Sequence, residues 1–134
     1  IYNYDSVFLH LYVAYIQMIL DKKRIFSKNI YQGISKKEAF KLHTDGLHCP
    51  ISNCWTPEEF IGMAKKSGMK CTFKGAAPEI STEMKMLPLR LDAITDYRLD
   101  SESRKFLYDL TFDDRGIPLY NNRVAGINAC FELT

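Results

Sequence analysis

Residues 41–74 read KLHTDGLHCPISNCWTPEEFIGMAKKSGMKCTFK, and they join a polar loop to a segment that carries the marks of both ends of a helix. Thr56 suits the N-cap, Pro57 suits the first helical position, and Glu59 completes a capping box. Gly68 is placed to adopt the left-handed conformation that ends many helices. The sequence therefore predicts a helix between Thr56 and Gly68.

A short strand is predicted directly after this helix. Apolar Met69, Cys71 and Phe73 alternate with polar residues, which is the period of a half-buried strand. The stretch therefore contains a loop, a helix and a strand in that order.

Three segments carry a family resemblance: TPEEFIGMAKKSGMKCTF at residues 56–73, TDGLHCPIS at residues 44–52, and YNYDSVFLHLYV at residues 2–13. The first looks like the late helix and sixth strand of class I S-adenosylmethionine-dependent methyltransferases. The other two resemble segments of one subgroup of that family. The likeness extends more loosely to the end of the chain and covers only the C-terminal portion of such an enzyme.

The resemblance implies an α/β fold, the incomplete C-terminal half of a Rossmann-like methyltransferase, mostly helical with two or three strands. In that family the seventh strand is antiparallel and lies between the fifth and sixth strands. Residues 124–133 are nearly continuous in apolar character, so they are expected to form this strand, buried on both faces. Cys71 and Cys130 are then expected to be small core residues.

No cofactor loop is readable in the chain. The family holds S-adenosylmethionine with a glycine-rich turn after its first strand, and here no two glycines are separated by a single residue. Residues 1–134 are therefore interpreted as a single domain or a fragment, with the cofactor-binding half upstream. S-adenosylmethionine is expected to bind the full-length enzyme and not this chain alone.

Composition agrees with one folded domain. The 134 residues are 46% hydrophobic and 25% charged, which is enough for one core. The net charge of +2 is spread along the chain without a basic run, so neither nucleic-acid nor membrane binding is indicated. Four cysteines without a secretory signal fit a reducing cytoplasm.

Residues 5–20 predict a helix that is apolar almost all round and is too short and too polar at His10 and Gln17 for a membrane span. Such a helix needs cover on several sides, and a short chain has little material for it. The expected partner is therefore an upstream cofactor domain or a second copy of the chain.

Polar residues of this opening segment share a register. Tyr2, Asn3, His10 and Gln17 are candidates for lining a pocket for a small-molecule methyl acceptor, because the resemblance places this helix near the acceptor. The alternative is that they are core polar groups satisfied by backbone or water.

A second short helix is predicted to start at Ser35, with Glu38 completing a capping box, and to end before Gly46, where it leads into the polar loop. This region supplies the remaining candidates. His43, flanked by Thr44 and Asp45, is the candidate catalytic base or acceptor-orienting group, since histidine titrates near neutrality. Asp45 and Ser52 are expected to hold a loop that closes over the substrate, and Trp55 is a further substrate-binding candidate.

Two other uses of this loop are less favoured. A zinc site is disfavoured because neither the His43 and His48 pair nor the Cys49 and Cys54 pair has the usual ligand spacing, so no metal is expected. A thiol hydrolase using Cys49 or Cys54 lacks an oxyanion site and a third orienting residue in the sequence.

Residues 75–120 are predicted to be mostly helical, with helices at 81–87 and 89–97, a third capped by Asp100, and a turn at 113–116. In the family such a stretch would be an insertion that shapes the acceptor site. Two function classes stay open: the acceptor-binding part of a methyltransferase, and a non-catalytic binding or assembly module related to methyltransferases.

Overall fold

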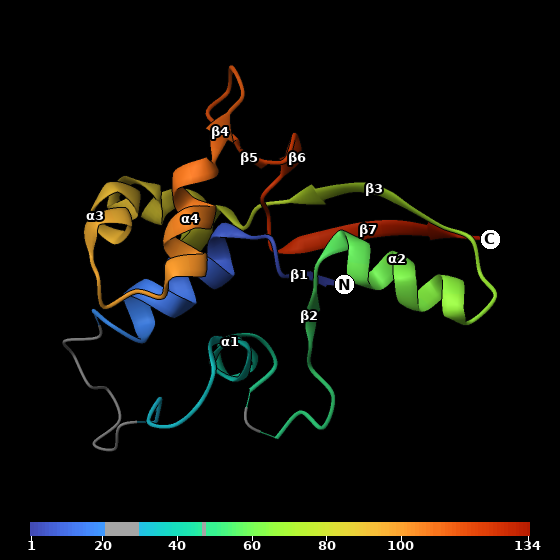
Figure 1. The fold of residues 1–134 in the computed structure, drawn as a ribbon, viewed down its shortest axis with the longest axis horizontal. Coiled ribbons are helices and arrows are strands. Elements are labelled where there is room, and N and C mark those ends of the chain that lie inside the picture. Colours follow the sequence, from blue (N-terminus) through green and yellow to red (C-terminus); the bar gives the residue numbers. More distant parts are fainter. Residues whose placement is uncertain (21–29, 47) are drawn as a thin grey trace.

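The computed structural model describes residues 1–20, 30–46 and 48–134. The fold is mixed α/β with two sheets (Figure 1). Its elements are, in order, β1 (Tyr2–Asn3), η1 (Phe8–Gln17), α1 (Lys36–Thr44), β2 (Cys54–Trp55), α2 (Pro57–Lys66), β3 (Cys71–Ala77), η2 (Ile80–Met84), η3 (Leu87–Leu89), α3 (Arg90–Thr95), α4 (Ser101–Asp109), β4 (Thr111–Phe112), β5 (Pro118–Tyr120), β6 (Arg123–Val124) and β7 (Asn128–Leu133).

The larger sheet has the strand order β2-β1-β7-β3. Strand β7 is antiparallel to both of its neighbours, β1 and β3, while β1 and β2 are parallel. The last strand of the chain therefore lies between β1 of the opening segment, which was not predicted to be a strand, and β3, the strand after α2. Figure 1 shows β3 and β7 as the long pair of the sheet, with α2 alongside them.

The prediction of two or three strands is wrong, because the described residues form seven. Four of the seven are only two residues long, too short to show alternation in the sequence. The smaller sheet, β4-β5-β6, was not predicted, although its first turn at residues 113–116 was.

Helices α1 and α2 begin as predicted, each with a complete capping box. Ser35 and Glu38 form the box of α1, and Thr56 and Glu59 form that of α2. Gly68 ends the second helix with φ of 78°, in the left-handed region. These local signals are accurate because they depend only on neighbouring residues.

The first helix differs from its prediction in length and in type. It spans residues 8–17 rather than 5–20, and its bonds include steps of five residues, from Met18 N to Val13 O and from Leu20 N to Tyr15 O. It is a π-helix, a form often found near functional sites.

The chain itself covers this π-helix. Its buried residues include Leu9, Leu11 and Val13, each without exposed surface, and the contacting elements are α1, α3, α4 and η2. Figure 1 shows α1 on one side of η1 and α4 on the other. The chain therefore covers the helix as far as Tyr15, which is still buried. The expectation that a chain this short has too little material to do so is wrong for this part of the helix.

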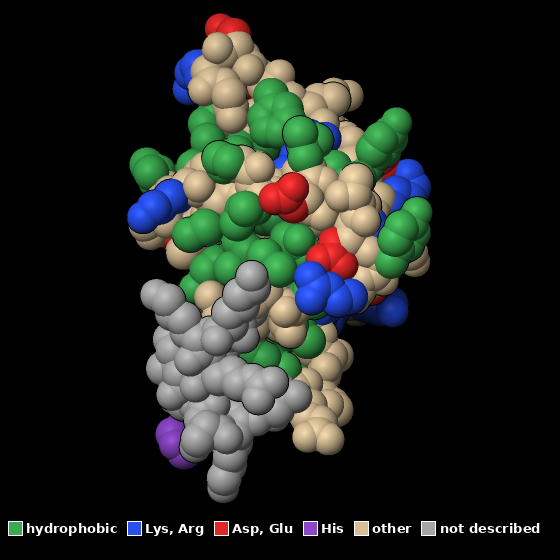
Figure 2. Space-filling model, turned by 90° about the vertical axis from the view of Figure 1, so that its left-hand side faces the viewer, with side chains coloured by type: hydrophobic (Ala, Val, Ile, Leu, Met, Phe, Trp, Pro, Cys, Tyr) green, Lys and Arg blue, Asp and Glu red, His purple; other side chains and the backbone are tan. Residues whose placement is uncertain are grey.

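The second part of the chain is helical where expected, with one helix shorter. Residues 81–87 are helical as predicted, from η2 through residues 85 and 86 into η3, whereas α3 spans only residues 90–95 of the predicted 89–97. Asp100 caps α4 as predicted, accepting a hydrogen bond from Ser103 N at 2.9 Å. Figure 2 shows hydrophobic side chains gathered on the side of the molecule where α3 lies, and Leu91 of α3 is 68% exposed.

The prediction for residues 124–133 is wrong in two respects. Strand β7 starts only at Asn128, because Val124 belongs to β6 and Gly126 packs tightly against another segment. A Cβ on Gly126 would lie 2.2 Å from the carbonyl carbon of Ala77, so only glycine fits there. The strand is also not buried on both faces: Cys130 is exposed and is not the core residue expected, while Cys71 is half-buried.

Of the helices in the described ranges, none combines the length and the apolar character needed to cross a membrane.

Candidate functional site

A cavity of about 370 Å³ lies where β1, η1 and α1 meet the start of β7, and this volume is in the range of small-molecule sites. Its walls come from segments far apart in the sequence. The lining residues are Tyr2, Phe8, Tyr12, His43, Thr44, Glu79, Thr82, Ile127 and Asn128. Two predicted site residues, Tyr2 and His43, are therefore brought together.

Aromatic rings form much of the wall. Phe8 and Tyr12 lie about one helical turn apart on η1, and their ring centroids are 5.0 Å apart. The Tyr12 ring meets the imidazole of His43 edge to face at 5.8 Å, and Tyr2 packs edge to face on Phe40 at 5.4 Å. These contacts hold the rings in fixed orientations around the cavity.

His43 is oriented by a residue that the sequence did not single out. Its Nε2 lies 2.7 Å from the hydroxyl of Tyr31, and the two rings stack with centroids 5.9 Å apart. Because α1 is fixed by its capping box and by the buried Phe40, the imidazole is presented from a rigid element. Tyr31 carries no sequence signal, since only the folded chain brings it to α1.

Tyr2 connects the cavity to the polar loop. Its hydroxyl donates a hydrogen bond to Asp45 Oδ1 at 2.9 Å, which raises the pKa of the Tyr2 phenol. The Ser52 hydroxyl, followed by the Tyr2 hydroxyl, lowers the pKa of the Asp45 carboxyl. Ser52 Oγ is nevertheless not within hydrogen-bonding geometry of any described residue. Asp45 thus lies beside the cavity, whereas Ser52 lines a separate pocket with Lys37 and Lys41.

Glu79 adds a negative charge to the wall. Ser81 and Thr82 each donate a backbone N–H and a hydroxyl to its carboxylate, which caps η2. The Ser81 hydroxyl, then the Thr82 hydroxyl, lower the pKa of Glu79 to about 2. The carboxylate is therefore ionised at neutral pH, a feature that no sequence motif indicated.

Asn3 lies outside this cavity and is satisfied by the backbone. It is 2% exposed, and its Nδ2 donates to the carbonyls of Asp5 and Gly126, both at 3.0 Å. Gln17 lies half-buried at the end of η1, away from the lining residues. Trp55 lies on β2, where the ammonium of Lys37 sits 5.5 Å from its ring centroid.

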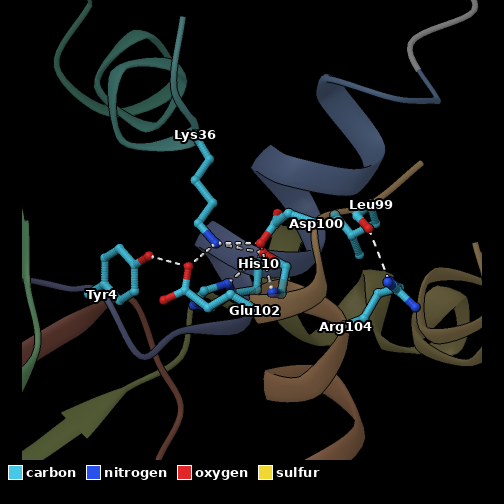
Figure 3. A network of polar contacts seen from close by, with 8 residues as sticks. Tyr4, His10, Lys36, Leu99, Asp100, Glu102 and Arg104 are labelled. Atoms are coloured by element: carbon cyan, nitrogen blue, oxygen red, sulfur yellow. Dashed lines mark hydrogen bonds and ion pairs between the residues drawn. The ribbon is translucent and has the colours of Figure 1, made fainter. Parts of the chain in front are cut away.

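His10 belongs to a separate buried network between η1 and α4 (Figure 3). Its Nδ1 lies 2.8 Å from Ser103 Oγ, and its ring stacks on Phe106 with centroids 4.2 Å apart. Burial, followed by the charge of Lys36, lowers the pKa of His10 to about 3. The imidazole is therefore neutral at physiological pH and joins two helices.

Lys36 is the centre of that network. Its ammonium donates to Asp100 at 2.9 Å, to Glu102 at 2.6 Å and to Ser103 at 3.0 Å, and Tyr4 donates to Glu102 at 2.9 Å (Figure 3). A second cavity of about 550 Å³ borders this network, but each of its charged residues already has an ion-pair partner: Lys36 pairs with Asp100 and Glu102, and Arg98 pairs with Asp96. The first cavity is therefore the better candidate site.

The residues weighed for metal or thiol chemistry are dispersed. His48 is exposed, and the Cys49 thiol donates to the carbonyl of Ile51 at 3.1 Å. Cys54 is buried, and burial raises the pKa of its thiol to about 11, so it is a poor nucleophile. Within residues 1–20, 30–46 and 48–134, no group of three His, Cys, Asp or Glu side chains is arranged to hold a metal ion.

Comparison with protein families, with curated protein sequences and with solved structures finds no match to this chain.

Proposed function

We propose that residues 1–134 form the acceptor-binding, C-terminal part of an S-adenosylmethionine-dependent methyltransferase that acts on a small molecule. The observation that carries the proposal is the cavity in which Tyr2, Tyr12 and His43 converge. It combines apolar walls with a few oriented polar groups, which is the usual character of small-molecule sites.

The strand order of the larger sheet supports the proposal. An antiparallel last strand lies between two strands that run parallel to each other, as the resemblance to Rossmann-like methyltransferases implies. In this interpretation β1, β7 and β3 correspond to the fifth, seventh and sixth strands of the family. The helices between β3 and β7 then form the insertion beside the acceptor.

The chemistry of methyl transfer suits this wall. Transfer to a nucleophile depends mainly on alignment and on exclusion of water, and a base is needed only when the acceptor has a proton to lose. Phe8 and Tyr12 supply apolar surface on one side of the cavity, and Tyr31 fixes the ring of His43. His43 is placed to orient the acceptor or to take its proton.

The residues of this chain do not fit the cofactor, because they offer no glycine-rich turn. We therefore assign S-adenosylmethionine to a cofactor-binding part outside residues 1–134. The four cysteines are free thiols, which agrees with a cytoplasmic enzyme.

A methyl-transfer assay tests the proposal. The natural protein that contains residues 1–134 is incubated with S-adenosylmethionine carrying a labelled methyl group and with fractions of a small-molecule extract. We expect label in one fraction, and less of it with Tyr12→Leu, which opens the aromatic wall. A protein that is folded and transfers no label to any fraction would contradict the proposal and favour the binding or assembly module.

A further inference from the structure

We propose that the cavity between η1 and α1 binds a small organic ammonium ion. As methyl acceptor this ligand would be a primary, secondary or tertiary amine, whose nitrogen becomes nucleophilic only after one N–H proton of the ammonium has passed to a base, the role assigned to His43. The identification of the ligand as the methyl acceptor rests on the proposed function. The binding of a cation is inferred from the cavity alone. Four rings line the cavity, those of Tyr2, Phe8, Tyr12 and His43. Aromatic faces attract cations through the negative potential above the ring.

The charges around the cavity have the sign that a cation needs. Glu79 on the wall is ionised, and the Asp45 carboxylate beside the cavity accepts a hydrogen bond from the Tyr2 hydroxyl. Among the described lining residues there is no lysine and no arginine. An anionic ligand would therefore meet two carboxylates and no positive side chain of these types.

The hydrogen bond from Tyr2 to Asp45 also acts on the ring. It raises the pKa of the Tyr2 phenol, so the hydroxyl keeps its proton, and it directs that proton toward the carboxylate. A phenol that donates to a carboxylate has a more electron-rich ring than a free phenol. The Tyr2 ring is thereby made a better partner for a cation than an unpaired tyrosine.

Size and shape agree with a small ammonium ion. The volume of about 370 Å³ holds an ion with several alkyl groups. The perpendicular packing of the Tyr12 and His43 rings keeps Tyr12 in one orientation on the wall. Thr44, Thr82 and Asn128 add polar groups that can accept an N–H or a hydroxyl of such a ligand.

The test compares a cation with its neutral isostere. Choline and 3,3-dimethylbutan-1-ol have the same shape and differ in charge, and each is titrated into the protein while backbone amide signals are followed. We expect choline to bind at least about fivefold more tightly, with shifts around Tyr12 and His43. Equal affinity for the two probes, or shifts elsewhere on the chain, would overturn the inference.

Three variants separate the ring from the charge. Tyr12→Phe keeps an aromatic face and should keep the preference for choline, whereas Tyr12→Leu keeps apolar bulk and should abolish most of it. Asp45→Asn still accepts a hydrogen bond from Tyr2 and should reduce the preference without changing the melting temperature. If Tyr12→Leu retains the full preference, the aromatic wall is not the recognition element and the inference is wrong.

The outcome is independent of the methyl-transfer assay. Selective choline binding by a protein that transfers no methyl group would leave the cation site intact and remove the proposed function. Methyl transfer to a fraction that contains no amine, without selective choline binding, would support the proposed function and remove the cation site.

Discussion

Glu83 Oε1 accepts a hydrogen bond from the backbone N–H of Phe8 at 3.0 Å, joining two helices that are 75 residues apart in the sequence. The other oxygen of the same carboxyl accepts from the N–H groups of Glu79 at 2.5 Å and Ile127 at 3.1 Å. Glu83 has no exposed surface. One buried side chain therefore fixes three segments that carry residues of the cavity wall.

Glu83→Ala should lower the free energy of unfolding by about 2 kcal/mol or more, because the buried N–H groups of Phe8 and Ile127 lose their acceptor, at roughly 1 to 3 kcal/mol each, and so does the part-buried N–H of Glu79. Urea unfolding at pH 7 measures the loss. The matched control is Glu132→Ala, which removes an exposed ion pair with Lys74 and should cost less than about 1 kcal/mol. Similar losses in the two variants would show that Glu83 does not join these segments.

The charge state of Glu83 should make stability fall as pH rises. Burial raises the pKa of Glu83 to about 7, above the value near 4.3 of an unfolded glutamate. Between these values the folded state binds more protons than the unfolded state, so rising pH favours unfolding. Relative to Glu83→Gln, which does not titrate, the wild type should lose up to about 3 kcal/mol between pH 4.5 and pH 8.

Urea unfolding of both proteins across that range gives the difference directly. Other titrating groups contribute to both proteins and largely cancel in the comparison. A difference that stays constant, or that favours the wild type as pH rises, would show that the buried carboxyl is not held in its protonated form.

The cysteines should differ sharply in reactivity. Cys130 is exposed on β7, whereas Cys54 is buried and its pKa is raised to about 11, so few Cys54 thiolates form at neutral pH. Mass spectrometry after timed alkylation should find Cys130 modified early and Cys54 modified only when the protein unfolds. Rapid modification of Cys54 in the folded protein would reopen the thiol-hydrolase interpretation.

Local signals made part of the fold predictable from sequence. The capping boxes at Ser35 and Thr56 predicted two helix starts, because a cap involves only residues within one turn. Strand β3 was predicted from the alternation at Met69, Cys71 and Phe73, and β7 from its apolar run together with the family resemblance, whereas the two-residue strand β1 was not predicted. The small sheet β4-β5-β6 was missed because its strands are two or three residues long.

The candidate site was predictable only where a residue carried a recognisable chemistry. His43 and Tyr2 line the cavity, but Tyr31, Glu79 and Glu83 were not identified. Their roles depend on contacts across long stretches of chain, such as that between Glu83 and Ile127, and nothing in the neighbouring sequence encodes those contacts. His10 had an equally suggestive position, yet burial makes it a neutral structural group.

The measurement that tests the account most directly is the turnover of His43→Ala in the natural protein that carries residues 1–134, with His48→Ala as the control. His43 lies on the cavity wall, and His48 is an exposed loop residue. We predict that His43→Ala lowers methyl transfer on the order of a hundredfold with an unchanged melting temperature, and that His48→Ala has no effect. Unchanged transfer in His43→Ala, or an equal loss in both variants, would contradict the assignment of this cavity as the acceptor site.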